Sequence, residues 1–98
     1  MGNEHFSGKP GELYDNYTAA VNGVKRLKAL YGTGMSTLIL IQNVTDKEVK
    51  FCKATYEASD NGGRWENDPT NIPAGKWMAC LHVHRDKAAV GSWGTLKV

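Results

Sequence analysis

Residues 37–43 read Thr-Leu-Ile-Leu-Ile-Gln-Asn, and this stretch decides which kind of fold the chain adopts. Successive side chains of a β-strand point to opposite faces, so an uninterrupted apolar run places hydrophobic groups on both faces. A strand of that kind is covered on both sides. The run is also far shorter than the ~18 apolar residues that span a membrane. It therefore predicts a buried strand in a globular domain, and no transmembrane segment.

A helical pattern precedes this strand. Aromatic and aliphatic residues recur at spacings of three and four, which places them on one stripe of a helix. They are Tyr14, Tyr17, Val21, Val24, Leu27 and Tyr31. Gly32 provides a stop signal suited to a left-handed cap, and Gly23 in the interior indicates close packing against a neighbour. We expect an amphipathic helix that lies on a sheet.

Strand patterns follow the central run. Asn43 to Lys47 has turn chemistry, so 49–58 is predicted to form a hairpin with 37–43. Residues 76–84 alternate as a further strand, and 89–98 form a glycine-broken strand that is expected to keep an unpaired edge. The predicted class is α+β, with one N-terminal amphipathic helix on an antiparallel sheet of about four strands. This layout is half of a β-sandwich, which we expect oligomerisation to complete.

Composition limits the possible functions. The chain has 98 residues, of which 41% are hydrophobic and 22% charged, as expected for one globular domain. We assign 1–12 to a flexible N-terminal arm and 13–98 to the domain. A net charge of +2 is too small for a dedicated nucleic-acid binder. The N-terminus has neither a basic region nor an apolar core, so we expect no signal peptide and a cytoplasmic location.

The segment 59–75 is rich in Asp, Asn, Gly and Pro and is long for a connection, so it is the candidate functional loop. Within it, Trp65 is flanked by polar side chains, as in a stacking platform for sugars or lipid headgroups. The predicted ligand-binding residues are Tyr56, Arg64, Trp65, Glu66 and Asp68. The alternative is that Trp65 folds back and caps an open end of the sheet.

Other aromatic and thiol groups suggest structural roles. Trp77 and Trp93 fall in strands and are expected in the core. Cys52 and Cys80 lie in apolar strand-like stretches, where a reduced thiol packs as a small hydrophobe. A cross-strand disulfide between the two cysteines is the other interpretation.

His82 and His84 are separated by one residue in a predicted strand, so their imidazoles project from one face and are weak candidates for a metal pair. Gly75 followed by this pair resembles the first motif of the cupin barrels. The glutamate of that motif is absent here, because Asp86 lies too close to His84, and the glycine spacing also differs. We therefore expect structural histidines and no cofactor, and keep a cupin-like metal-dependent enzyme as an alternative.

Four stretches, at 24–34, 38–45, 72–84 and 88–94, together resemble the 23-kilodalton jasmonate-induced proteins of plants. The resemblance implies a role in stress or defence responses and supplies no catalytic residues. Members of that family are longer and have a second β-rich half, so this short form is expected to pair with itself as a homodimer or higher oligomer. The leading interpretation is a non-enzymatic plant defence protein that binds a glycan or lipid headgroup through 59–75. A membrane-active defence protein is a further alternative.

Overall fold

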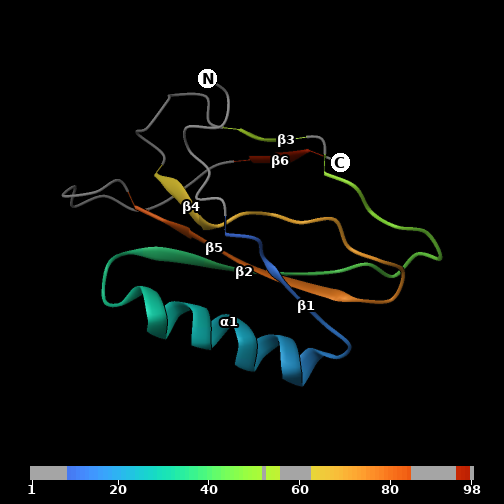
Figure 1. Ribbon diagram of the computed structural model, residues 1–98, viewed down its shortest axis with the longest axis horizontal. Coiled ribbons are helices and arrows are strands. Elements are labelled where there is room, and N and C mark those ends of the chain that lie inside the picture. Colours follow the sequence, from blue (N-terminus) through green and yellow to red (C-terminus); the bar gives the residue numbers. More distant parts are fainter. Residues whose placement is uncertain (1–8, 52, 56–62, 85–94, 98) are drawn as a thin grey trace.

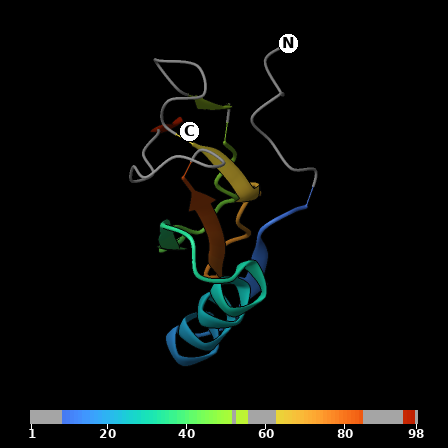
Figure 2. The same ribbon diagram turned by 90° about the vertical axis from the view of Figure 1, so that its left-hand side faces the viewer.

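A computed structural model describes residues 9–51, 53–55, 63–84 and 95–97 of the chain (Figure 1). In chain order the elements are β1 (Glu12–Tyr14), α1 (Tyr17–Tyr31), β2 (Ser36–Gln42), β3 (Lys53–Thr55), β4 (Arg64–Asn67), β5 (Trp77–Val83) and β6 (Thr95–Lys97). The helix covers one face of an antiparallel sheet formed by β1, β2, β4 and β5, and the β3–β6 pair lies on the other side (Figures 1 and 2). This arrangement confirms the predicted α+β class.

The helix ends where the sequence indicates but begins later, because Tyr14 of the predicted stripe belongs to β1 and α1 starts at Tyr17. The Asn16 side chain accepts a hydrogen bond from the backbone N–H of Ala19 at 2.8 Å and caps the N-terminus. Gly32 ends the helix at φ 112°, a conformation that favours glycine, and its N–H donates to the Lys28 carbonyl at 2.9 Å. Val24 and Leu27 of the predicted stripe are buried, whereas Tyr17 is 61% exposed.

Strand β5 is the centre of the larger sheet. It pairs with β2 along one side, from Ser36 opposite Val83 to Gln42 opposite Trp77. On its other side it pairs with β1 over its first half and with β4 over its second half. Because β5 has neighbours on both sides and layers on both faces, every residue from Met78 to Val83 is buried.

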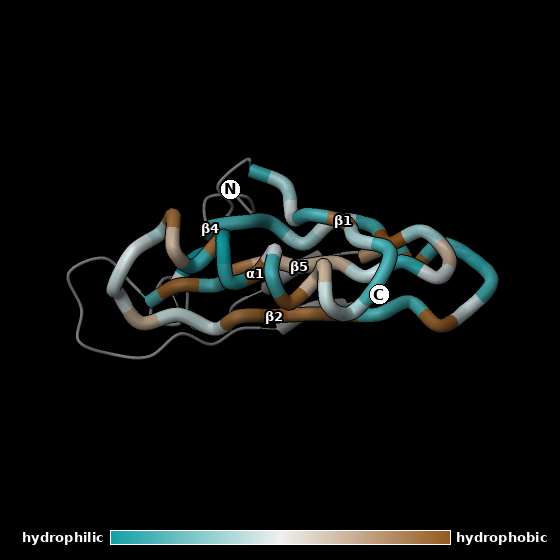
Figure 3. The backbone as a smooth tube through the Cα atoms, turned by 90° about the horizontal axis from the view of Figure 1, so that it is seen from below, coloured by the Kyte–Doolittle hydropathy of each residue, from teal (hydrophilic) through white to brown (hydrophobic). Residues whose placement is uncertain are grey.

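The core lies on both faces of this sheet. On the helix side, Val24 and Leu27 pack with Ala79 and Leu40. On the far side, the cluster comprises Trp65, Ile72, Met78 and Cys80, with Ile39, Ile41, Val49 and Phe51 packed against it. Figure 3 shows the hydrophobic colours concentrated along β2 and β5. Cover on both sides is therefore confirmed for Ile39, Leu40 and Ile41, whereas Thr37, Leu38 and Gln42 of the predicted strand are exposed.

The predicted hairpin between 37–43 and 49–58 is wrong. Strand β2 pairs with the distant β5, Val49 bridges to Ile72, and β3 pairs with β6. The physical reason is that β5 is apolar on both faces and needs a long partner without charges, which β2 provides. The described part of 89–98, β6, pairs with β3 in a two-stranded sheet, so this strand has a partner on one side.

The N-terminal segment differs from the predicted flexible arm. Gly11 N–H donates to the Asp68 carbonyl and Asp68 N–H donates to the Lys9 carbonyl, both at 2.7 Å. Residue 12 already belongs to β1. Residues 9–11 are therefore hydrogen-bonded to the segment at Asp68, Glu12 belongs to the sheet, and residues 1–8 lie outside the described part of the chain.

Candidate functional site

An exposed pair of aromatic rings lies at the end of the molecule where β5 begins. Tyr17 is the first residue of α1 and Trp77 the first residue of β5. Their ring centroids are 5.3 Å apart with the planes inclined at 59°. Tyr17 is 61% exposed and Trp77 is half-buried, so the pair has one face on the protein and one in solvent.

Two loops place polar and aliphatic groups beside these rings. The Lys76 ammonium donates to the Asp15 carboxylate in an exposed ion pair, which links the start of β5 to the turn before α1. Asn43 N–H donates to the Lys76 carbonyl and Gly75 N–H donates to the Asn43 carbonyl, both at 2.9 Å. These two hydrogen bonds hold the loop after β2 next to Lys76.

Asn43 also fixes the shape of that loop. Its amide donates to the carbonyls of Lys47 and Ile72 at 2.7 and 2.8 Å, and its oxygen accepts from the N–H of Thr45 at 2.9 Å. These bonds confirm the predicted turn. They leave Val44 at the tip with 79% of its surface exposed. We call the set Asp15, Tyr17, Val44, Lys76 and Trp77 the aromatic end.

The aromatic end is suited to binding at a surface. Tyr and Trp combine an apolar ring with a polar group, and they are enriched where a protein meets both an apolar phase and water. The exposed Val44 offers a small apolar group that gains by leaving water. The ammonium and carboxylate of the Lys76–Asp15 pair offer a donor and an acceptor next to it. The arrangement can therefore hold an amphipathic surface or ligand without a chemical reaction.

The predicted exposed platform at Trp65 is wrong. Trp65 is 2% exposed, and its ring meets the His82 ring edge-on with centroids 4.7 Å apart. It belongs to β4, whose register with β5 shifts between Trp65 and Asn67, and such a bulge redirects side chains. The indole N–H is buried and has no hydrogen-bond partner among the described residues. The alternative interpretation was that Trp65 caps an open end of the sheet; the ring is buried as that alternative requires, but from within β4 and in the far-side cluster.

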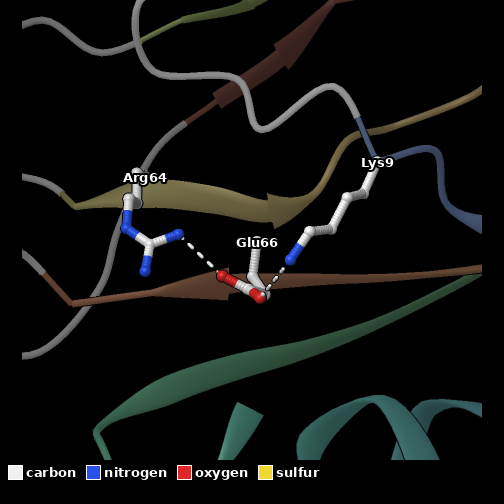
Figure 4. A network of polar contacts seen from close by, with 3 residues as sticks. All are labelled: Lys9, Arg64 and Glu66. Carbon is white, nitrogen blue, oxygen red and sulfur yellow. Dashed lines mark hydrogen bonds and ion pairs between the residues drawn. The ribbon is translucent and has the colours of Figure 1, made fainter. Parts of the chain in front are cut away.

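The polar neighbours of Trp65 bind one another. The Glu66 carboxylate accepts from Arg64 at 2.7 Å and from Lys9 at 3.2 Å (Figure 4). Burial opposes ionisation of Glu66, but the hydrogen bonds from Arg64 and Lys9 outweigh it and lower the pKa of this carboxyl. These residues attach the N-terminal segment to β4.

The structure describes one of the two remaining predicted ligand residues. Asp68 contributes the backbone bonds to Lys9 and Gly11 described above. Tyr56 lies outside the described residues.

The two candidate metal histidines have separate surroundings. His82 is 2% exposed and packs on Trp65. His84 lies instead beside Gly34 and the Tyr31 hydroxyl: a Cβ at position 34 would come within 2.6 Å of His84 Nε2 and 2.7 Å of that hydroxyl. Within the described ranges, no group of three His, Cys, Asp or Glu side chains is arranged to hold a metal ion.

Cys80 is buried in the far-side cluster and forms no disulfide. Burial, together with the nearby Asp68 carboxylate, raises the pKa of the Cys80 thiol to about 12. Cys52 lies outside the described residues.

Comparison with known proteins agrees with this fold. The family described as Nakanori-like protein matches residues 11–97. This chain belongs to the Nakanori-like family. It is 35% identical over 74 residues to the 23 kDa jasmonate-induced protein of Hordeum vulgare, as the sequence resemblance predicts. The match covers 74% of this chain and 34% of the barley protein, so the chain spans about a third of that relative.

A solved structure shares the fold. The crystal structure of the lipid binding protein Nakanori superposes with a TM-score of 0.69 at 26% sequence identity. The superposition covers 81% of this chain and 38% of Nakanori. Among the residues whose placement is described, no helix has the length and hydrophobicity needed to cross a membrane.

Sequence reasoning missed the aromatic end as a site. Tyr17 fits the helical stripe and Trp77 fits a strand, so both were expected to be covered. The sequence did contain one signal for their exposure, which is the position of each residue at the start of its helix or strand. Tyr17 directly follows the N-cap Asn16, and Trp77 follows the turn at Gly75 after one residue, so each ring lies at an element's first residue, where cover ends.

Proposed function

We propose that this chain is a non-enzymatic binding protein of plant stress or defence responses that docks on the headgroup region of lipid membranes. The observation that carries the proposal is the pair of the exposed Tyr17 ring and the half-buried Trp77 ring, 5.3 Å between centroids, at the end where Val44 protrudes. The name of the lipid binding protein Nakanori supports the ligand class. The name of the barley relative supports the biological setting.

The binding follows from ordinary interfacial physics. The rings of Tyr17 and Trp77 settle at headgroup depth, with the phenol and indole polar groups toward water. Val44 inserts more deeply, and a fully buried aliphatic side chain contributes about 1.5–3 kcal/mol. Lys76 and Asp15 lie close enough to this surface to exchange their mutual ion pair for contacts with headgroup charges. Two rings at headgroup depth and one inserted aliphatic side chain together give weak, reversible binding.

Co-sedimentation with lipid vesicles tests the proposal. The chain should pellet with phosphatidylcholine vesicles, and Tyr17→Ala should reduce the bound fraction at least about threefold because it removes an exposed interfacial ring. Leu30→Ala is the matched control, since Leu30 is 74% exposed but lies near the opposite end of α1. Absence of wild-type pelleting, or equal losses in the two variants, would contradict the proposal.

A further inference from the structure

Strand β2 forms an edge of the sheet. Its only strand partner in the described part of the chain is β5, and seven consecutive residue pairs join the two without a bulge. Further hydrogen bonds, from His84 N–H to the Met35 carbonyl and from Asn43 N–H to the Lys76 carbonyl, extend the pairing at both ends at 2.9 Å. The outer side of β2 is therefore a regular row of backbone donors and acceptors.

This edge lacks the usual protection against pairing. Edge strands commonly carry charges, proline or bulges that prevent another chain from adding to them. The residues from Ser36 to Gln42 include no charged residue, no proline and no glycine. Leu38 adds an apolar side chain that is 43% exposed, and Figure 3 shows β2 along one margin of the sheet in hydrophobic colours.

The strand is complementary to itself. In an antiparallel pair centred on Ile39, Leu38 lies opposite the partner's Leu40, and Ser36 lies opposite the partner's Gln42. Apolar side chains then meet in the middle and polar side chains meet at both ends. A register shifted by one residue would lose this match on both faces.

The charges beyond the strand ends are also complementary. The Lys28 ammonium donates to the Gly34 carbonyl, two residues before β2. In the loop after β2, the exposed carboxylates of Asp46 and Glu48 lie on either side of the exposed Lys47, so these three residues carry one net negative charge. An antiparallel pair brings the start of one β2 beside the end of the other, so cation and carboxylates approach at both ends.

We propose that β2 pairs with β2 of a second copy of this chain around Ile39. The pairing joins the two sheets into one continuous sheet, with both helices on the same face because the two-fold axis is perpendicular to the sheet. The interface uses the edge strand β2 and none of the five residues of the aromatic end, although its margin reaches the loop that carries Val44.

Light scattering and sedimentation of the whole chain, from about 1 µM to about 300 µM, test this pairing. A monomer–dimer equilibrium is expected. Leu38→Lys should raise the dimer dissociation constant at least about tenfold, because it removes an apolar contact and adds a charge at the edge. Leu30→Lys, at a more exposed leucine of α1, should leave the constant unchanged. A monomer throughout this range, or a dimer that Leu38→Lys leaves intact, would overturn the proposal.

Cross-linking keeps the test valid if Leu38→Lys does not fold. In a Cys52→Ser background, Ile39→Cys places two thiols opposite each other across the axis, within the Cα separation that a disulfide allows. With oxidised glutathione as oxidant, Ile39→Cys should form a covalent dimer faster than Met35→Cys. Met35 is 54% exposed and Ile39 is half-buried, so random collision predicts the reverse order. The reverse order would overturn the proposal.

Discussion

The phenol ring of Tyr14 lies against Gly23, in the space that a side chain at position 23 would need. The hydroxyl end of the ring is the part nearest Gly23, and it is held there because the Tyr14 hydroxyl donates to the Glu12 carboxylate, which also accepts from Arg26. Strand β1 and helix α1 are thereby fixed to each other. The predicted close packing at Gly23 is confirmed.

Gly23→Ala should destabilise the fold although alanine favours helices. Overpacking costs about 1–3 kcal/mol, which exceeds the roughly 1 kcal/mol gained in helix propensity. We expect the free energy of unfolding, measured by urea titration, to fall by about 1–2 kcal/mol. In a Tyr14→Ala background the same substitution should be neutral or stabilising. If Gly23→Ala costs as much in that background, the contact with Tyr14 is not the cause.

The Glu66 ion pairs predict acid sensitivity. Burial of Glu66 raises the pKa of its carboxyl, but the hydrogen bonds from Arg64 and Lys9 outweigh this effect and lower the pKa from 4.5. The folded state therefore favours the charged form. This contribution is complete above pH 4.5 and is lost as the pH falls through the lowered folded pKa. Glu66→Gln should cost about 0.5–1 kcal/mol at pH 7 and reduce the loss of stability on acidification.

Thermal unfolding at a series of pH values measures this effect. Glu48→Gln, which removes an exposed carboxylate from the loop after β2, is the control and should leave the curve unchanged. Parallel curves for Glu66→Gln and the wild type would exclude Glu66 as a source of the acid sensitivity. The stability of both the wild type and Glu66→Gln should still fall to some extent at low pH. The reason is that hydrogen bonds from Arg26 and Tyr14 outweigh the effect of burial and also lower the pKa of Glu12.

Cys80 should be chemically inert in the folded protein. Burial, with the Asp68 charge, raises the pKa of its thiol to about 12, so the thiolate is scarce at pH 8 and the sulfur is covered. Iodoacetamide should modify Cys80 at least about tenfold more slowly in buffer than in urea, as followed by peptide mass mapping. Equal rates in the two conditions would mean that this part of the core is open.

The sequence predicts the helix well because its signals are local. The spacing of Val24 and Leu27 and the stop at Gly32 act within a few residues of each other, whereas the N-cap at Asn16 was not identified. The two-sided cover at the centre of 37–43 is likewise readable from the residues themselves, because charges are absent from both faces.

Strand pairing is less accessible from the sequence. The turn at Asn43 is real, yet the chain continues to Val49 and its bridge with Ile72 instead of returning along β2. The partner of β2 is decided by which strand buries the most apolar surface, and that strand, β5, begins 35 positions after Gln42. Propensity and turn chemistry do not report contacts over such a separation.

The candidate site was predicted in kind but not in place. An aromatic residue among polar groups was expected at the surface, and the structure has such a group at Tyr17 and Trp77, not at Trp65. Composition around Trp65 indicates a loop, whereas the bulge in β4 and the space beside His82 decide that its ring is buried. Both depend on the assembled sheet.

The account depends most on which end of the molecule meets a membrane. Val44 and Leu30 are 79% and 74% exposed, and they lie at the aromatic end and near the opposite end of α1. In a Cys52→Ser background, an environment-sensitive fluorophore is attached to Val44→Cys or to Leu30→Cys, and phosphatidylcholine vesicles are added. The account predicts a blue shift and higher intensity for the label at position 44 and little change at position 30. Equal responses, or a response at position 30 alone, would contradict it.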